Sequence, residues 1–217
     1  MRLMAWIGSG LALLFCLAGC QSAYFAAMEK VGIHKRDILI DRVEDARESQ
    51  QEAKEEFQSA LEAFAALTGF DGGELEDRYN ELKEVLERSE DKADEVHERI
   101  NAVEDVAEAL FEEWAAELEE YNSPSLRRSS EQQLRDTRNR CDALVRSMRR
   151  AEEKITPVLT PLRDQVLYLK HNLNARAVSA LRNELRSVET DVASLIKDLE
   201  QAVAEADRFI RQLEAGR

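Results

Sequence analysis

The sequence predicts an all-α protein, built as an elongated antiparallel bundle of about four long helices. Apolar residues recur in alternating steps of three and four over most of the chain, which is the spacing of a helix with a narrow apolar seam. The 217 residues include only eight Gly and three Pro, too few for the frequent turns of an all-β fold. A content of 44% apolar residues, regularly spaced, also argues against a disordered acidic chain.

The first two helices are separated by a glycine cluster. A heptad pattern begins after Gly32 and ends at Thr68, and residues 69–73 contain three of the eight glycines. We expect these glycines to supply positive φ values for a tight reversal. The second pattern keeps the same spacing over residues 74–121, long enough to indicate a coiled coil.

The third and fourth helices follow a break at residues 122–125, which contain Pro and small polar residues suited to a turn. The third pattern passes through Thr156-Pro157 and Thr160-Pro161 without a change of phase, which favours a kink there and a reversal near residues 171–174. The alternative is that the third helix ends at residue 156 and the last one exceeds fifty residues. The last segment is again a clean heptad.

The N-terminus has the features of an export signal. Arg2 precedes an apolar stretch of about the length of a signal sequence, and the stretch ends in the lipobox-like residues Leu17, Ala18, Gly19 and Cys20. The alternative, a transmembrane anchor, would need about 20 apolar residues. The pattern therefore predicts a signal peptide at 1–19, a lipidated tether at 20–30 with the lipid on Cys20, and one helical-bundle domain at 31–217.

Location and redox state follow from the residues around this signal. Gln21 stands where lipoproteins kept at the inner membrane often have Asp, so it favours the outer membrane, facing the periplasm. Cys16 leaves with the signal and Cys20 is acylated, so Cys141 is the one remaining thiol. Its seam position predicts a buried thiol, and the alternative is an intermolecular disulfide.

Charge is distributed unevenly between the second and third helices. Residues 74–121 hold 19 acidic and 5 basic side chains, whereas residues 125–150 hold 8 Arg and 3 acidic residues. One interpretation is that the two helices lie side by side and that their charges fix the pairing. The other is a docking patch for lipid phosphate or another anion, formed by arginines of the third helix: Arg127, Arg128, Arg135, Arg138, Arg146, Arg149 and Arg150.

No catalytic, metal-binding or cofactor-binding pattern is found in the sequence. The phosphate-binding loop GxxxxGK[ST] is absent, and the three histidines lie far apart without metal-ligand spacing. Carboxylates are abundant, but they fall at solvated helix positions where nothing separates their pKa values. The net charge of −14 argues against a nucleic-acid partner.

Four segments resemble a family of uncharacterised lipoproteins of Gram-negative bacteria, a domain of unknown function. They are Lys35-Arg36-Asp37-Ile38-Leu39, Arg42-Val43-Glu44-Asp45-Ala46, Ser125-Leu126-Arg127-Arg128 and, above all, the run from Asp164 to Ala175. The resemblance implies a secreted, lipidated, helical protein without an assigned activity. Members of that family are sometimes labelled DNA-repair ATPases, which the export signal and the missing phosphate loop contradict here.

The segment from Asp164 to Ala175 is the best candidate for a specific contact, because four consecutive apolar residues precede polar ones at the expected bend. The candidates for docking a partner are Asp164, Tyr168, Lys170, His171, Asn172 and Asn174, and the alternative is a wider core contact. The sequence thus predicts a membrane-anchored scaffold or interaction module of the cell envelope that has an envelope protein as partner and can form homo-oligomers. The contrasting hypotheses are an envelope hydrolase and a cytoplasmic coiled-coil accessory to DNA metabolism.

Overall fold

The computed structural model describes Met28, residues 34–70 and residues 74–215. These residues form five α-helices and one short 3-10 helix: α2 (Lys35–Thr68), α3 (Leu75–Glu117), η1 (Leu118–Glu120), α4 (Pro124–Glu152), α5 (Ile155–His171) and α6 (Ala175–Ala215). No strand occurs among them. The predicted signal peptide, and the tether apart from Met28, lie outside the described residues.

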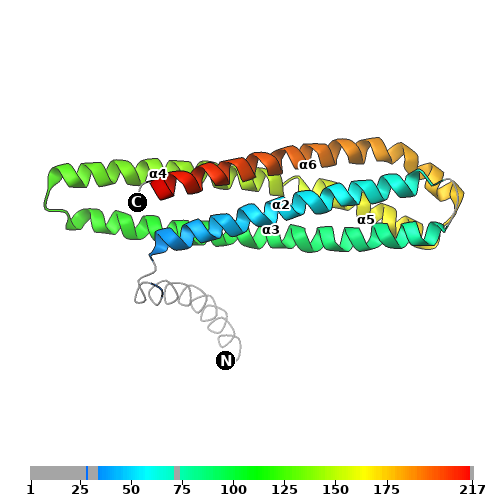
Figure 1. Ribbon diagram of the computed structural model, residues 1–217, viewed down its shortest axis with the longest axis horizontal. Coiled ribbons are helices and arrows are strands. Elements are labelled where there is room, and N and C mark those ends of the chain that lie inside the picture. Colours follow the sequence, from blue (N-terminus) through cyan, green and yellow to red (C-terminus); the bar gives the residue numbers. More distant parts are fainter. Residues whose placement is uncertain (1–27, 29–33, 71–73, 216–217) are drawn as a thin grey trace, which may run out of the picture.

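The helices form an elongated antiparallel bundle, as predicted (Figure 1). α4 and α5 run in the same direction and together make the third of four long rods. α2 packs against α3 and α6, and the α4–α5 rod packs against the same two helices from the opposite corner. Short connections between antiparallel neighbours are the usual way to build such an up-and-down bundle.

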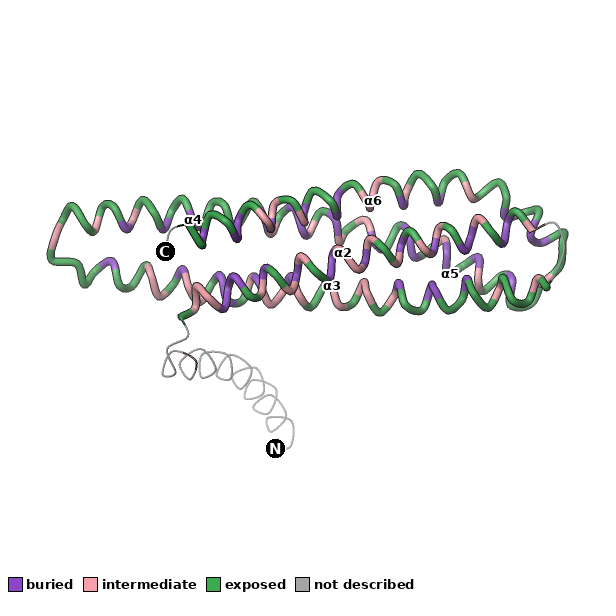
Figure 2. The backbone as a smooth tube through the Cα atoms, viewed as in Figure 1, coloured by how far each residue is buried: buried purple, intermediate pink, exposed green. Residues whose placement is uncertain are grey.

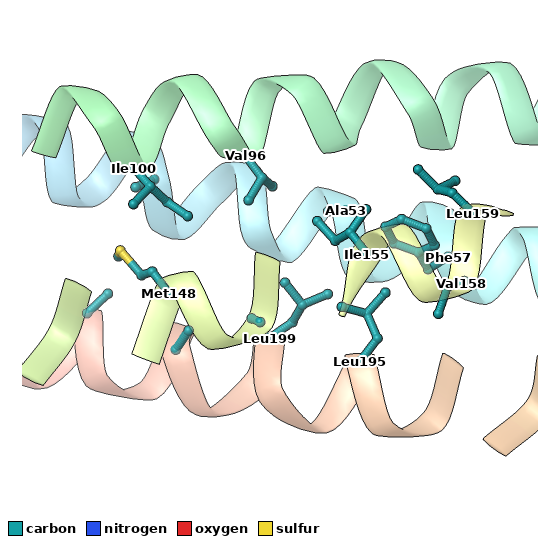
Figure 3. Close-up of a cluster of buried hydrophobic side chains, with 14 of the residues drawn as sticks. Ala53, Phe57, Val96, Ile100, Met148, Ile155, Val158, Leu159, Leu195 and Leu199 are labelled. Carbon is teal, nitrogen blue, oxygen red and sulfur yellow. The ribbon is translucent and has the colours of Figure 1, made fainter. Parts of the chain in front are cut away.

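The seam residues form one continuous core along the bundle. Figure 2 shows the buried positions recurring along the inner side of each helix, as the heptad pattern requires. In the middle part of the bundle, Ile100 of α3 lies across from Met148 of α4, and farther along Phe57 of α2 lies beside Val158 and Leu159 of α5 (Figure 3). Phe57, Ile100 and Met148 have no exposed surface.

Ion pairs along the α2–α3 contact fix the register of these two helices. Arg88 pairs with Glu56 at 3.2 Å, Lys92 with Glu52 at 2.5 Å and Arg99 with Asp45 at 3.3 Å. The numbers rise along α3 as they fall along α2, so the pairs mark successive heights of an antiparallel contact. Exposed pairs of this kind contribute little to stability, so their effect is mainly on register.

The turn after α2 differs from the prediction at Gly69. This residue has φ −82°, so no positive φ is used there. A side chain would instead crowd the backbone, since a Cβ at Gly69 would lie 3.2 Å from the carbonyl oxygen of Ala65. Gly72 and Gly73 lie outside the described residues.

The third rod breaks at Glu153 and Lys154, slightly before the prolines, and reverses at residues 172–174. Pro157 is the third residue of α5. Proline has no N–H to donate to the carbonyl four residues earlier, which belongs to Glu153, and its ring clashes with that carbonyl. The break therefore lies one turn before the proline, while Pro161 is accommodated inside α5.

Lys154 ties this break to the last helix. Its Nζ lies 2.6 Å from Oδ2 of Asp198 and donates to Oγ of Ser194 at 2.8 Å. Asp198 is buried, so the ion pair supplies the charge that a buried carboxylate requires. The ion pair and the hydrogen bond of Lys154 therefore hold the break against α6.

Candidate functional site

The predicted docking segment lies where α5 ends and α6 begins, at the end of the bundle where α2 also ends (Figure 1). Leu167 and Tyr168 are 59% and 44% exposed and are two of the four large apolar side chains that are exposed among the described residues, with Tyr121 and Leu126. Val166 and Leu169, their neighbours, pack against or within the core. The alternative of a wider core contact therefore holds for Val166 and Leu169 and not for Leu167 and Tyr168.

Asn172 and Asn174 act as local caps at this turn. The side chain of Asn172 donates to the carbonyl of Tyr168 at 3.0 Å, at the C-terminus of α5. The side-chain oxygen of Asn174 accepts from the backbone N–H groups of Arg176 and Ala177, each at 3.1 Å. This is the N-cap arrangement that satisfies the first free N–H groups of a helix.

The charged candidates of this segment face solvent. Asp164, Lys170 and His171 are all exposed, and none has an ion-pair partner within the described part of the chain. The neighbouring Arg163, in contrast, is paired with Glu90 of α3 at 2.6 Å. The surface available to a partner is therefore Leu167 and Tyr168 with a rim of unpaired charge, and the two asparagines shape the turn beneath it.

The charges of α3 and α4 pair at a few points only. Arg149 contacts Glu104 of α3 and also bonds Glu152 of its own helix at 2.8 Å. His97 Nδ1 lies 2.5 Å from the other carboxylate oxygen of Glu152, and Arg127 pairs with Glu119 at the end of the hairpin. At these contacts, opposite charges of the two neighbouring helices pair as expected. The basic residues of α3, in contrast, pair chiefly with acidic residues of α2.

The network around Glu152 shifts its ionisation. Burial disfavours the charged form of this carboxyl most, but hydrogen bonds from Arg149 and His97 outweigh it and hold the pKa of Glu152 below its usual value. The pKa of Arg149 is raised, since burial is again outweighed by its bonds to Glu104 and Glu152. The network therefore works as a charge-paired clamp between α3 and the end of α4.

The four predicted anion-docking residues do not form one cluster. Arg127 is paired with Glu119, Arg135 bonds Glu131 of its own helix at 2.9 Å, and the Arg138 guanidinium lies 5.2 Å from the centroid of the Phe111 ring. Arg128 is exposed and has no ion-pair partner among the described residues. The same holds for Arg146 and Arg150.

Cys141 lies on the seam as predicted and is 1% exposed. Burial raises the pKa of its thiol to about 12, and the carboxylates of Asp142 and Glu104 add to this effect. A thiol that remains protonated and enclosed is a poor nucleophile, so its position favours a core role over an intermolecular disulfide.

Two grooves flank the seam between α3 and α4. The outer one, a hollow of about 880 Å³, has Ala107, Phe111 and Val145 among its apolar lining residues. The inner one, about 470 Å³, is closed by the start of α2 and the end of α6 and is lined in part by Trp114. Trp114 donates from Nε1 to Oγ of Ser130 at 2.8 Å, which joins the two helices at this height.

The outer groove was not anticipated from the sequence. Its rim contains Asp105, Glu108 and Glu112 on α3 and Arg138 and Arg146 on α4. The sequence does contain a periodic pattern that could have indicated it, because next to the seam positions the three acidic residues are spaced by three and four and the two arginines by eight. Their grouping into one groove depends on which side of the α3–α4 contact is left open, and a heptad pattern does not specify that.

The structure places no group of three or more His, Cys, Asp or Glu side chains that could hold a metal ion within the residues it describes. None of the described helices is long and apolar enough to cross a membrane. Cys20, the predicted lipidation site, lies outside the described residues.

Comparison with known proteins gives a family but no activity. No curated protein and no solved structure is significantly similar to this chain. A family described as "Protein of unknown function (DUF2959)" matches residues 24–213, which include every helix described above except the last two residues of α6. The chain therefore belongs to the DUF2959 family of proteins of unknown function.

Proposed function

We propose that this protein is a lipoprotein of the outer membrane, acylated at Cys20 and facing the periplasm, whose bundle serves as a scaffold or interaction module without catalysis. The observation that carries the proposal is the pattern Leu17, Ala18, Gly19 and Cys20, which follows an apolar segment and ends four residues before the first family-matched residue, 24. Several acyl chains on one cysteine would give stable membrane attachment, which a single chain does not.

The arrangement of the helices supports a role in reaching or bridging. α2 begins at Lys35, which pairs with Glu113 in the half of the bundle that contains the α3–α4 hairpin, whereas α5, which carries Leu167 and Tyr168 in its last turns, ends at the opposite end of the bundle (Figure 1). The 43 residues of α3 correspond to about 65 Å at 1.5 Å per residue. A lipid at Cys20 would therefore hold one end at the membrane and present the Leu167–Tyr168 surface tens of ångströms away, where an envelope protein could dock.

The chemistry of the described residues supports the absence of catalysis in this proposal. The groups whose pKa values are shifted are members of ion pairs, such as Lys92 with Glu95 and Arg149 with Glu152, or the buried thiol of Cys141. Each of these groups is held within the bundle: Lys92 and Glu95 pair with each other, Glu152 bonds Arg149 and His97, and Cys141 is enclosed in the core.

Replacement of the lipidated residue tests the anchoring. Cys20→Ala should be found in soluble fractions and should not incorporate a labelled fatty acid, whereas the wild type should sediment with the outer membrane. Cys141→Ala is the matched control, because it removes the other cysteine of the mature chain and should remain at the membrane. Sedimentation of Cys20→Ala with the outer membrane would contradict the anchoring.

Substitutions at the far end test the docking surface. Leu167→Ala and Tyr168→Ala remove exposed side chains, so both should leave the thermal midpoint nearly unchanged while reproducing the growth defects of a deletion strain. Leu169→Ala is the control, since this side chain is fully buried and its loss should destabilise the fold by about 2–5 kcal/mol. Stable Leu167 and Tyr168 variants with wild-type growth would contradict docking at this surface.

A further inference from the structure

The outer groove between α3 and α4 has an apolar floor and two rims of opposite charge. Phe111 and Ala107 from α3 and Val145 from α4 contribute the floor. Val145 is only partly buried, so some of this apolar surface remains accessible to a partner. A partner that covers the groove would remove this surface from water, which is the main favourable term in association.

The acidic rim lies on α3 and the basic rim on α4. Asp105, Glu108 and Glu112 are exposed and have no ion-pair partner in the described part of the chain. Across the groove, Arg138 and Arg146 are exposed and likewise make no ion pair with described residues. The groove therefore offers acidic side chains on α3 and, on α4, two arginines with one acidic residue, Asp142, between them.

Contacts within the chain fix the heights of these residues along the bundle. Arg138 lies over Phe111, which places it at the height of Glu112, the next residue of α3. The helices are antiparallel, so the Arg149–Glu104 contact places Arg146 near the height of residue 107 and the Arg138–Phe111 contact places it near residue 103; Asp105 lies between these two heights. Each arginine thus has an acidic residue at its own height on the opposite rim.

We propose that a second copy of this chain docks in the outer groove to form a parallel, two-fold symmetric dimer. A two-fold axis parallel to the bundle brings α4 of each copy against α3 of the other and leaves every residue at its height. Arg146 then faces Asp105 of the partner copy, and Arg138 faces Glu112, on both sides of the axis. The interface is self-complementary, as two-fold symmetry requires.

This dimer places both Lys35 residues at the same end, so two lipid anchors could enter one membrane, although the dimer does not depend on lipidation.

One contact opposes the dimer, because Asp142 of each copy lies near the height of Glu108 of the other. The overall charge of −14 also repels, but the Debye length of about 8 Å at physiological salt screens this long-range effect more than the direct contacts.

Charge reversal at one matched pair tests the dimer. Arg146→Glu and Asp105→Arg each create two like-charge contacts, so each single variant should self-associate about tenfold or more weakly than the wild type. An equimolar mixture of the two variants should recover dimers, because both contacts between positions 105 and 146 in the heterodimer join opposite charges. The measurement is sedimentation equilibrium of the full chain in a non-ionic detergent, with circular dichroism to confirm that each variant is folded.

Arg186→Glu and Glu189→Arg are the matched controls, since both residues are exposed on α6, away from the groove, and make no ion pair with described residues. Each should dimerise like the wild type. The proposal would be overturned by a wild-type chain that stays monomeric up to about 100 µM, by single groove variants that dimerise normally, or by a mixture that fails to recover dimers.

A cross-linking experiment tests the parallel orientation separately. Glu112→Cys and Arg138→Cys chains, mixed and oxidised, should form a disulfide between the two copies. Glu98→Cys mixed with Arg138→Cys should not, because Glu98 lies about 20 Å from Glu112 along α3. Cross-linking of the second mixture and not of the first would exclude the parallel arrangement.

Discussion

Gln50 is a polar residue in the apolar core, and its replacement by Leu should stabilise the protein. The side chain is completely buried, and neither its amide nitrogen nor its amide oxygen has a hydrogen-bond partner. A buried polar group without a partner costs about 1–3 kcal/mol. Gln50→Leu should therefore raise the free energy of unfolding by about 2 kcal/mol, equivalent to about 4–8 °C in the thermal midpoint of a domain of this size.

Urea unfolding at pH 7 measures this change, and Gln51→Leu is the control. Gln51 is half-buried and bonds Glu55 of its own helix at 2.9 Å, so its replacement should change stability by less than about 0.5 kcal/mol. Equal stability of the wild type and Gln50→Leu, or destabilisation by the substitution, would show that the Gln50 amide is satisfied in solution and would refute the reasoning.

Three further predictions concern the core, the thiol and the clamp between α3 and α4. Phe57→Ala, at a fully buried position, should cost about 3–5 kcal/mol in urea unfolding, whereas Gln58→Ala, at an exposed one, should be nearly neutral. Cys141 should not react with a thiol reagent at pH 8 until the protein unfolds, because burial raises its pKa to about 12; rapid labelling of the native chain would contradict this. The pKa of Glu152 is lowered from 4.5 in the folded state, so its stabilising effect is present above that value and is lost as the pH falls through the folded pKa. Glu152→Gln should accordingly be less stable than the wild type at pH 7, and the difference, measured by urea unfolding, should shrink below about pH 4.5; a difference that persists at pH 2 would contradict the assignment.

The helices could be predicted from the sequence because each carries its own periodic signal. The seam from Leu39 to Leu67 corresponds to α2, and the seam that begins at Leu75 corresponds to α3. Helix boundaries were predicted less accurately where an α-helix passes into a 3-10 turn before the loop. The predicted end of the second helix at residue 121 is a 3-10 turn, Leu118–Glu120, which follows the last α-helical residue, Glu117.

The pairing of charges was harder to predict, because a heptad places a residue on a face without identifying the neighbour of that face. The composition of α3 and α4 suggested that they neutralise each other, yet Arg88, Lys92 and Arg99 of α3 turn toward α2. The outer charges of α3 and the free arginines of α4 face solvent as a result. This outcome depends on the order of the four rods around the core, which no local pattern encodes.

The reversal after residue 171 was predicted correctly, but the sequence did not show which residues of the docking segment shape the turn and which are exposed to a partner. Asn172 and Asn174 cap helices, which their residue type and position at a helix boundary could have indicated. The exposure of Leu167 and Tyr168 could not be inferred, because four consecutive apolar residues fit a wider core equally well. α5 contacts α3 and α6 and leaves its outer face open, and this decides which of the four residues are buried.

We propose that a lipid on Cys20 holds the bundle at a membrane, and the mass of the protein purified from native membranes is the sharpest test. The mature chain should begin at Cys20, should have lost residues 1–19 and should exceed its peptide mass by that of several acyl groups on the N-terminal peptide. A chain that still begins at Met1, or one whose Cys20 has an unmodified thiol, would contradict it.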